Sequence, residues 1–208
     1  MFDSVLTSAV KKTLDVLSRQ DFMRPFYLAG GTGCALHLGH RRSKDLDFFS
    51  PAEFDPVSIQ NALRNLGRFT ADYSEAGTLV GRFDEMKISL FHYAYPLIGE
   101  AVHGLGVRIA SLIDIGCMKI DAISSRGAKR DFVDLFFILK ALGLELRAFL
   151  GHFERKYGPA GFNRHHILKS LVYFEDADKD PDPEMFAEFS WDAAKRFFEE
   201  GVGALGPA

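Results

Sequence analysis

Residues 26–50 read FYLAGGTGCALHLGHRRSKDLDFFS, and this stretch decides the predicted fold. The apolar run 26–29 has the length and composition of a strand. The glycine cluster at 30–33 predicts a turn that ends this strand. Residues 34–40 then predict a short helix, and residues 44–49 predict a second strand. We therefore expect the order strand, glycine turn, helix and strand.

Two carboxylates mark the second predicted strand. Side chains alternate along a strand, so Asp45 and Asp47 are expected on one face, with their Cα atoms about 7 Å apart. Two like charges this close repel unless a cation neutralises them, and carboxylate oxygens suit Mg²⁺. The preceding glycine turn and helix start offer backbone N–H groups that suit phosphate. Together these features predict chemistry on a nucleotide.

A second motif lies further along the chain. It comprises KIDA at residues 119–122, Arg126, and KRDFVDL at residues 129–135. Lys119 and Arg126 are seven residues apart, so on a helix they share one face and form a cationic stripe that suits phosphates. Asp131 and Asp134 fall in the first turn of the next predicted helix. There they hold these cations in place, and Asp131 either caps the helix, pairs with Arg126 or takes part in acid–base chemistry.

Both motifs, in this order, resemble those of the nucleotidyltransferase superfamily that has the DNA polymerase β-type fold. Within it, the chain is similar to the AbiEii/AbiGii-type toxin nucleotidyltransferases, through residues 29–32 and 42–49 and through the second motif. The resemblance implies an α+β fold, in which a polymerase β-type domain with a small mixed sheet and flanking helices precedes a helical C-terminal region. We expect the two regions to be 1–110 and 111–208.

The resemblance also implies a role for each motif residue. Mg²⁺ is expected on Asp45 and Asp47, the predicted metal ligands. The residues expected to be catalytic are Asp45, Asp47, Lys119 and Asp131. The residues expected to bind the nucleotide are Gly30, Gly31, Thr32, Arg42, Ser43, Arg126 and Asp134. In the basic run 41–44, the resemblance favours Arg42 and Ser43 over Arg41 and Lys44.

A third carboxylate, which polymerase β-type enzymes usually supply from a later strand, is missing from its expected place. That strand is predicted at residues 86–91, where the face shared by Lys87 and Ser89 carries no acidic residue. The acidic dipeptide 84–85 lies in the hairpin turn predicted before it. Three alternatives stay open: two acidic ligands suffice with Ser89 or water, Asp84 reaches into the site, or catalysis is impaired.

The rest of the chain predicts strands in its first half and helices in its second. Further strands are expected at 68–73, 78–83, 86–93 and 107–110. Helices are expected at 2–19, 56–67, 111–126, 130–142, 145–157, 163–174 and 191–199. The acidic, proline-interrupted segment 175–184 is expected to be an exposed loop. A basic cluster within 163–169 is expected either as a solvated helix start or as a contact for an RNA acceptor.

Composition excludes several classes of protein. The chain has 208 residues, of which 47% are apolar, so it can bury a core and is not expected to be disordered. A net charge of −3 excludes a basic surface over the whole chain, although not a local basic patch. Cys34 and Cys117 are expected to be free and buried, and the histidine spacing predicts no zinc site. No membrane span or signal peptide is predicted, so we expect a cytoplasmic protein.

These features predict a Mg²⁺-dependent nucleotidyltransferase, which moves a nucleoside monophosphate from an NTP to a hydroxyl group. The resemblance implies a toxin of a toxin–antitoxin or phage-defence pair, with tRNA as the acceptor and a cognate antitoxin as partner. One alternative is a small-molecule adenylyltransferase of the antibiotic-modifying kind, which the acidic segment 175–184 fits. The other is a non-catalytic domain that binds a nucleotide or a partner protein, which the missing acid at Ser89 fits.

Overall fold

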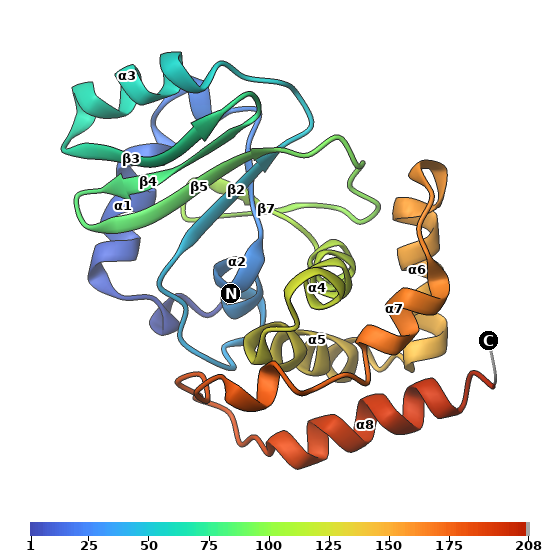
Figure 1. Ribbon diagram of the computed structural model, residues 1–208. Coiled ribbons are helices and arrows are strands. Elements are labelled where there is room, and N and C mark those ends of the chain that lie inside the picture. Colours follow the sequence, from blue (N-terminus) through green and yellow to red (C-terminus); the bar gives the residue numbers. More distant parts are fainter. Residues whose placement is uncertain (207–208) are drawn as a thin grey trace.

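A seven-stranded mixed sheet forms the centre of the protein (Figure 1). The computed structural model describes residues 1–206. The strand order is β3-β4-β5-β2-β1-β7-β6, with β1–β7 and β2–β5 parallel and the other neighbours antiparallel. The strands are β1 (Tyr27–Leu28), β2 (Leu46–Ser50), β3 (Phe69–Glu75), β4 (Thr78–Phe83), β5 (Met86–His92), β6 (Val102–Gly104) and β7 (Val107–Ile109). The predicted strands are confirmed, and β6 is one that the sequence did not predict.

Helices flank the sheet and make up most of the second half of the chain. They are α1 (Ser8–Ser18), α2 (Gly30–Leu38), α3 (Pro56–Leu66), α4 (Leu112–Arg126), α5 (Lys129–Leu142), α6 (Leu146–Tyr157), α7 (Arg164–Ser170) and α8 (Trp191–Gly203). The strands thus precede α4 to α8, so the predicted α+β fold with a helical C-terminal region is confirmed. The division of the chain into two regions at residue 110 stays a prediction.

The two faces of the sheet have different neighbours because side chains alternate along each strand. Along β2, Leu46 and Phe48 are buried in a core that includes residues of α1 and α3. Asp47 and Phe49 alternate with them, and both line a cleft together with residues of α4. One strand therefore contributes to the core with one face and to a cleft with the other.

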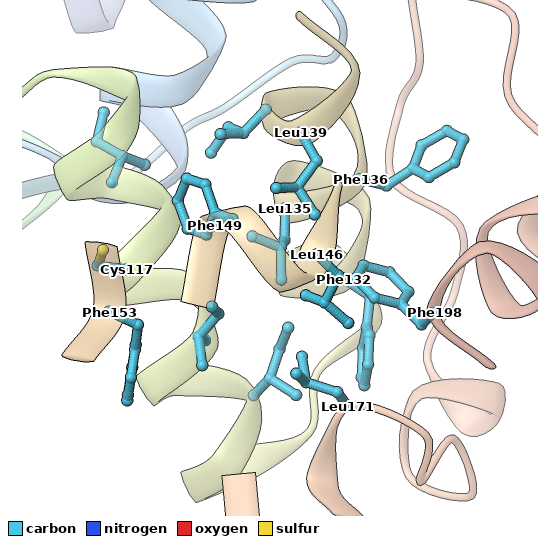
Figure 2. Packing of buried hydrophobic residues seen from close by; sticks show 14 of the residues in the cluster. Cys117, Phe132, Leu135, Phe136, Leu139, Leu146, Phe149, Phe153, Leu171 and Phe198 are labelled. Atoms are coloured by element: carbon cyan, nitrogen blue, oxygen red, sulfur yellow. The ribbon is translucent and has the colours of Figure 1, made fainter. Parts of the chain in front are cut away.

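Aromatic side chains hold the C-terminal helices together (Figure 2). The ring of Phe132 in α5 is fully buried, and its centroid lies 5.3 Å from that of Phe174, 5.8 Å from that of Trp191 and 5.5 Å from that of Phe198. Tilted and edge-on contacts between rings of this kind stabilise a core by more than the burial of their apolar area alone. They join α5 to α8 and to the segment between α7 and α8.

Capping residues fix the ends of the helices. The Asp55 side chain accepts hydrogen bonds from first-turn amides of α3, and the Ser111 side chain does the same for α4, as the sequence predicts. Gly127 and Gly143 end α4 and α5 in the left-handed conformation, with φ of 60° and 62°. The end at Gly127 sets the short turn that brings α5 back against α4, and the end at Gly143 leads into α6.

The structure corrects the prediction for the glycine cluster. Helix α2 begins at Gly30 and ends at Leu38, so the glycines form its first turn and do not precede a helix at 34–40. The pattern predicted a break because glycine disfavours helices. Here a close contact requires glycine, since a Cβ on Gly31 would lie 2.5 Å from Arg41 Nη2. Tertiary packing therefore overrides the local preference.

The packing of α4 against α6 gives a prediction about stability. A Cβ on Gly116 in α4 would overlap the ring of Phe149 in α6, whereas a Cβ on Gly151 in α6 would meet nothing within 4 Å. We expect Gly116→Ala to lower the free energy of unfolding by about 1–3 kcal/mol, because overpacking strains the core. Gly151→Ala, the matched control, should raise it by about 0.5–1 kcal/mol. Urea unfolding measures both, and equal midpoints would contradict this packing.

Candidate active site

One cleft collects most of the predicted site residues. It has a volume of about 1040 Å³ and lies between the sheet face that carries Asp47 and helices α4 and α5. The predicted residues that line it are Gly30, Gly31, Arg42, Ser43, Asp45, Asp47, Lys119, Arg126 and Asp131. Thr32 and Asp134 are not among its lining residues and are buried. The two motifs, far apart in the sequence, therefore meet at one place.

Asp45 and Asp47 lie together on the floor of the cleft. Strand β2 begins at Leu46, one residue after Asp45 and not at residue 44 as predicted, and both carboxylates line the cleft. Burial raises the pKa of Asp47, and the negative charge of Asp45 also raises it. Such a carboxylate is costly to ionise without a cation, and paired carboxylate oxygens are ligands that Mg²⁺ prefers. The residues present therefore fit a divalent metal ion.

Gly30 allows the Asp47 carboxylate to lie against the start of α2. Gly30 has a φ of +60°, and a Cβ on it would be 2.7 Å from Asp47 Oδ2. The amides of Gly30 and Gly31, which also line the cleft, belong to the first turn of the helix and have no intrahelical acceptor. A helix start of this kind suits phosphate oxygens. The metal ligands and a candidate phosphate site are thus adjacent.

The position of a third carboxylate is occupied by Ser89, as predicted. Ser89 pairs in register with Asp47 across β5 and β2. Asp84 lies in the β4–β5 turn, where its Oδ1 accepts a hydrogen bond from the Arg68 amide at 3.0 Å. It is not a lining residue, so the alternative in which Asp84 reaches into the site is wrong. Asp121, to which the sequence analysis gave no role, lines the cleft from α4.

Thr32 connects the start of α2 to the loop that leads into β2. Its hydroxyl lies 2.8 Å from Ser43 Oγ and also donates to the Asp45 carbonyl oxygen. With its side chain buried and both contacts internal, Thr32 positions Ser43 and Asp45. The Thr32 hydroxyl is therefore engaged within the protein, and the predicted part of Thr32 in nucleotide binding stays a prediction.

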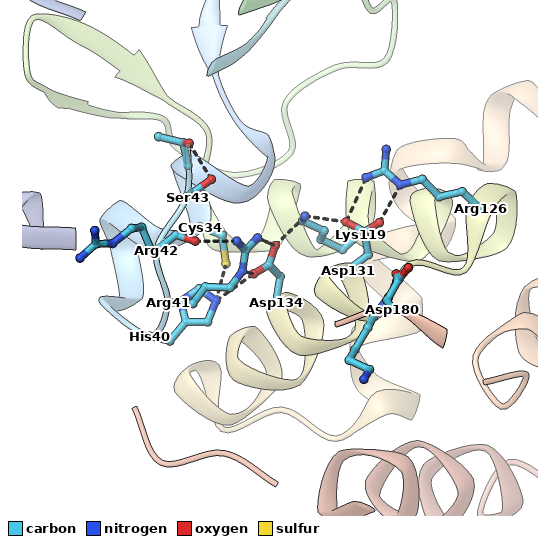
Figure 3. A network of polar contacts seen from close by, with 12 residues as sticks. Cys34, His40, Arg41, Arg42, Ser43, Lys119, Arg126, Asp131, Asp134 and Asp180 are labelled. Atoms are coloured by element: carbon cyan, nitrogen blue, oxygen red, sulfur yellow. Dashed lines mark hydrogen bonds and ion pairs between the residues drawn. The ribbon is translucent and has the colours of Figure 1, made fainter. Parts of the chain in front are cut away.

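A buried network of charges forms one wall of the cleft (Figure 3). Asp134 accepts hydrogen bonds from Arg41 Nε at 2.6 Å and Arg41 Nη2 at 2.7 Å, and its Oδ2 lies 2.6 Å from Lys119 Nζ. Lys119 Nζ also donates to Asp131 Oδ1 at 2.7 Å, and Asp131 Oδ2 accepts from Arg126 Nε at 2.8 Å. These contacts link the loop after α2 to both α4 and α5.

Burial and neighbouring charges shift the pKa values of this network in opposite directions. Burial alone would raise the pKa of Asp131 and Asp134, but Lys119 together with Arg126 or Arg41 holds both pKa values below the ordinary range. Burial alone would lower the pKa of Lys119, but the two carboxylates raise it above its ordinary value. Asp131, Asp134 and Lys119 are therefore charged at neutral pH, and Lys119 is a fixed cation at the wall of the cleft.

The structure separates Arg41 from Arg42. Arg41 is buried in the network beside Gly31, whereas Arg42 is partly exposed, with its Nε 3.2 Å from Glu184 Oε1. Asp134 holds the guanidinium of Arg41, and the preference for Arg42 and Ser43 as triphosphate-binding groups stays a prediction. A run of four polar residues at 41–44 has no apolar period from which its buried member could be recognised.

An acidic rim, residues 180–184, borders the cleft. The sequence predicted an exposed loop across 175–184, and the rim is largely exposed, but it also lines the cleft. Asp182 pairs with Lys129 Nζ at 2.9 Å, and the Asp180 carboxylate accepts a hydrogen bond from the Lys129 amide at 3.0 Å. Asp182, like Glu184, therefore pairs with a cation of the protein itself, whereas Asp180 binds a backbone amide.

Cys34, His40 and Asp134 form the one group of three potential metal ligands found within residues 1–206. Asp134 is already bonded to two cations, and burial raises the pKa of the Cys34 thiol well above its ordinary value. His40 Nε2 lies 2.8 Å from Asp134 Oδ1 and completes the buried network. We interpret this group as structural. Both Cys34 and Cys117 are free and buried, as predicted.

Solved structures identify the class of the fold. The nucleotidyltransferase toxin MenT4 of Mycobacterium tuberculosis is similar, with a TM-score of 0.59 and 13% identity over 94% of this chain and 83% of that one. JHP933 of Helicobacter pylori has a TM-score of 0.53 and 14% identity over 95% and 89%. The antibiotic-resistance factor ANT(2'')-Ia has a TM-score of 0.52 and 14% identity over 72% and 92%. The fold is that of a nucleotidyltransferase.

Sequence comparison identifies the family. The family model described as "Nucleotidyl transferase AbiEii toxin, Type IV TA system" matches residues 12–90 and 86–204. The uncharacterized protein aq_aa25 of Aquifex aeolicus (strain VF5) is 40% identical over 181 residues, which are 85% of this chain and 86% of that protein. The chain therefore belongs to the AbiEii nucleotidyltransferase toxin family, and the predicted resemblance is confirmed. No helix in the described part of the chain is long and apolar enough to cross a membrane.

Removal of the Asp134 charge should destabilise the fold. Asp134→Asn leaves Arg41 and Lys119 buried with one carboxylate fewer, so we expect the free energy of unfolding at pH 7 to fall by about 3–5 kcal/mol. Asp15→Asn, the matched control, breaks an exposed pair with Arg19 and should cost less than about 1 kcal/mol. Urea titration measures both values. A loss for Asp134→Asn as small as that of the control would contradict the network.

The same variant should alter the pH dependence of stability. The folded pKa values of Asp131 and Asp134 lie below the unfolded value of about 3.9. Their contribution is therefore complete above that value and is lost as the pH falls toward the folded pKa. Below about pH 4 the wild type should lose stability more steeply than Asp134→Asn. Parallel curves would show that Asp134 is not the group that titrates.

Proposed function

We propose that the protein is a Mg²⁺-dependent nucleotidyltransferase, which moves a nucleoside monophosphate from an NTP to a hydroxyl group and releases pyrophosphate. One observation carries this proposal. A single cleft holds Asp45 and Asp47 on its floor, the start of α2 beside them, and Lys119 and Arg126 on its wall. Membership of the AbiEii family supports the same class of reaction.

Asp45 and Asp47 would hold the metal ion. When bound, Mg²⁺ supplies activation of the acceptor hydroxyl and neutralises charge on the phosphates. Ser89 lies opposite Asp47 and offers a hydroxyl in place of a third carboxylate. Two carboxylates with a hydroxyl or water are a sufficient ligand set for Mg²⁺, which commonly keeps several waters.

The groups around the metal ligands would bind the triphosphate. On one side these are the amides of Gly30 and Gly31 with Ser43 and Arg42. On the other side, Lys119 and Arg126 present fixed positive charge to the cleft. Such groups stabilise the charge that develops on phosphate oxygens as the leaving group departs.

Asp131 would act by holding Lys119 and Arg126. Its pKa lies below the ordinary range because these two cations outweigh the effect of burial. An ionised carboxylate engaged by two cations is a poor proton donor or acceptor at neutral pH. We therefore assign to Asp131 a positioning role in preference to the acid–base role that the sequence left open, and Asp134 has the same role one helical turn later.

The biological setting is also part of the proposal. We propose a toxin that acts in the cytoplasm, uses tRNA as the hydroxyl acceptor, and is controlled by a cognate antitoxin. The description of the family as a toxin of a type IV toxin–antitoxin system supports the toxin and its partner. The tRNA acceptor rests on the resemblance between the motifs of this chain and those of the family.

A second candidate is a small-molecule adenylyltransferase, because the acidic rim 180–184 borders the cleft and a cationic drug would favour carboxylates there. The fold it shares with ANT(2'')-Ia is compatible with this function. However, Asp182 pairs with Lys129, and Glu184 pairs with Arg42, so these carboxylates already have cationic partners. We therefore favour the RNA acceptor.

Pyrophosphate release tests the proposal. We expect release from at least one NTP in the presence of Mg²⁺ and bulk tRNA, and a loss of roughly a hundredfold or more in the Asp45→Asn/Asp47→Asn double variant. Asp84→Asn, which changes a carboxylate in the β4–β5 turn outside the cleft, is the matched control and should retain activity.

The other outcomes discriminate among the alternatives. Release that needs a small hydroxylated amine instead of tRNA would establish the adenylyltransferase. If Mg²⁺ and an NTP raise the melting temperature but no acceptor yields pyrophosphate, the protein is a nucleotide-binding domain. Equal activity in the wild type and the double variant would refute the metal site at Asp45 and Asp47.

A further inference from the structure

A second cavity, which we name the α4–α7 cavity, lies beside the active-site cleft. It has a volume of about 400 Å³, and its lining includes Arg126, His166, Lys169 and Tyr173. Ser125 and Arg126 line both this cavity and the cleft. A ligand bound in the cavity can therefore extend into the cleft along Arg126.

The lining also includes residues of α7 and of the turn that follows it. His166, Lys169, Ser170 and Tyr173 are spaced at i, i+3, i+4 and i+7, which places them in one row along a helix and its extension. Lys169 and Tyr173 are exposed to solvent. An exposed aromatic ring beside a cation is the arrangement with which proteins bind single-stranded nucleic acid, because the ring stacks on a base and the cation contacts a phosphate.

The charge of the cavity favours an anion. Among residues 1–206, no carboxylate forms an ion pair with Lys169, and the Arg126 side chain is 53% exposed although it holds Asp131. Asp176, the carboxylate of the cavity lining, pairs with Lys179 at 3.2 Å. A phosphodiester entering the cavity would thus meet Lys169 and the exposed part of Arg126, together with the paired Asp176 and, beside Tyr173, the Glu175 carboxylate that accepts a hydrogen bond from the Tyr173 hydroxyl at 3.0 Å.

We propose that the α4–α7 cavity binds the end of an RNA acceptor strand, with a phosphate between Lys169 and Arg126 and a base against Tyr173. The proposal rests on the proposed nucleotidyltransferase function and names the site of its second substrate. Arg126 lines both the cavity and the cleft, so an RNA strand that passes it would extend its terminal hydroxyl toward Asp45 and Asp47.

Binding of fluorescently labelled bulk tRNA to the full chain tests the proposal without requiring catalysis. For Lys169→Ala/Tyr173→Ala we expect roughly tenfold weaker affinity or more, because a stacking contact and a phosphate contact are lost. The slope of log affinity against log salt concentration should become shallower by about one. Tyr173→Phe, which keeps the ring, should bind like the wild type. Lys12→Ala, an exposed lysine on α1, is the matched control and should change neither quantity.

The same proteins, tested for stabilisation by Mg²⁺ and NTP, separate the remaining outcomes. Lys169→Ala/Tyr173→Ala should keep the full increase in melting temperature that Mg²⁺ and NTP give the wild type. Loss of that increase with unchanged tRNA affinity would put the base of the NTP in the cavity and overturn the proposal. Unchanged tRNA affinity, or a wild type that binds no tRNA, would also overturn it. Pyrophosphate release with a small hydroxylated acceptor would then leave the transferase standing without this site.

Discussion

The buried position of Lys119 between Asp131 and Asp134 is the constraint on which the rest of the site depends. Its ammonium group lies 2.7 Å and 2.6 Å from the two carboxylates and the residue is only 4% exposed. A charge withdrawn from water in this way is tolerated only while its partners stay in place, so α4 and α5 must keep their spacing. Asp134 also holds Arg41, and Arg41 fixes the loop that leads to Asp45. The charge network thus connects the helical half of the molecule to the floor of the cleft.

Strand β2 provides the second constraint, because its two faces serve different purposes. Leu46 and Phe48 are buried in the core, and Asp47 between them faces the cleft. A shift of the strand by one residue would move the carboxylate into the core and an aromatic ring into the cleft. The parallel pairing of β2 with β5, which sets Ser89 opposite Asp47, prevents this shift. The packing that stabilises the fold therefore also positions the proposed metal ligands.

Local signals, namely alternation, helical spacing and capping residues, were sufficient for every strand except β6 and for most helices, whereas the expectation that the two motifs share a site came from the family resemblance. Prediction from the sequence failed where contacts between residues far apart in the chain determine the structure. Gly30 and Gly31 lie in the first turn of a helix, where the close approach of Asp47 and Arg41 favours glycine, and neither approach can be read from neighbouring residues. The burial of Arg41 depends on Asp134, 93 positions away in the chain. For the same reason, neither the place of the acidic rim beside the cleft nor the α4–α7 cavity could be predicted.

Transfer of label from an NTP to RNA would test the proposed chemistry most directly. The folded protein would be incubated with Mg²⁺ and bulk tRNA and with each NTP labelled either at the α-phosphate or at the γ-phosphate. Nucleotidyl transfer joins the α-phosphorus to the acceptor oxygen and releases the other two phosphates as pyrophosphate, so we predict label in the RNA from the α position alone. Label from the γ position, or no label in RNA from any NTP, would contradict an RNA nucleotidyltransferase centred on Asp45 and Asp47.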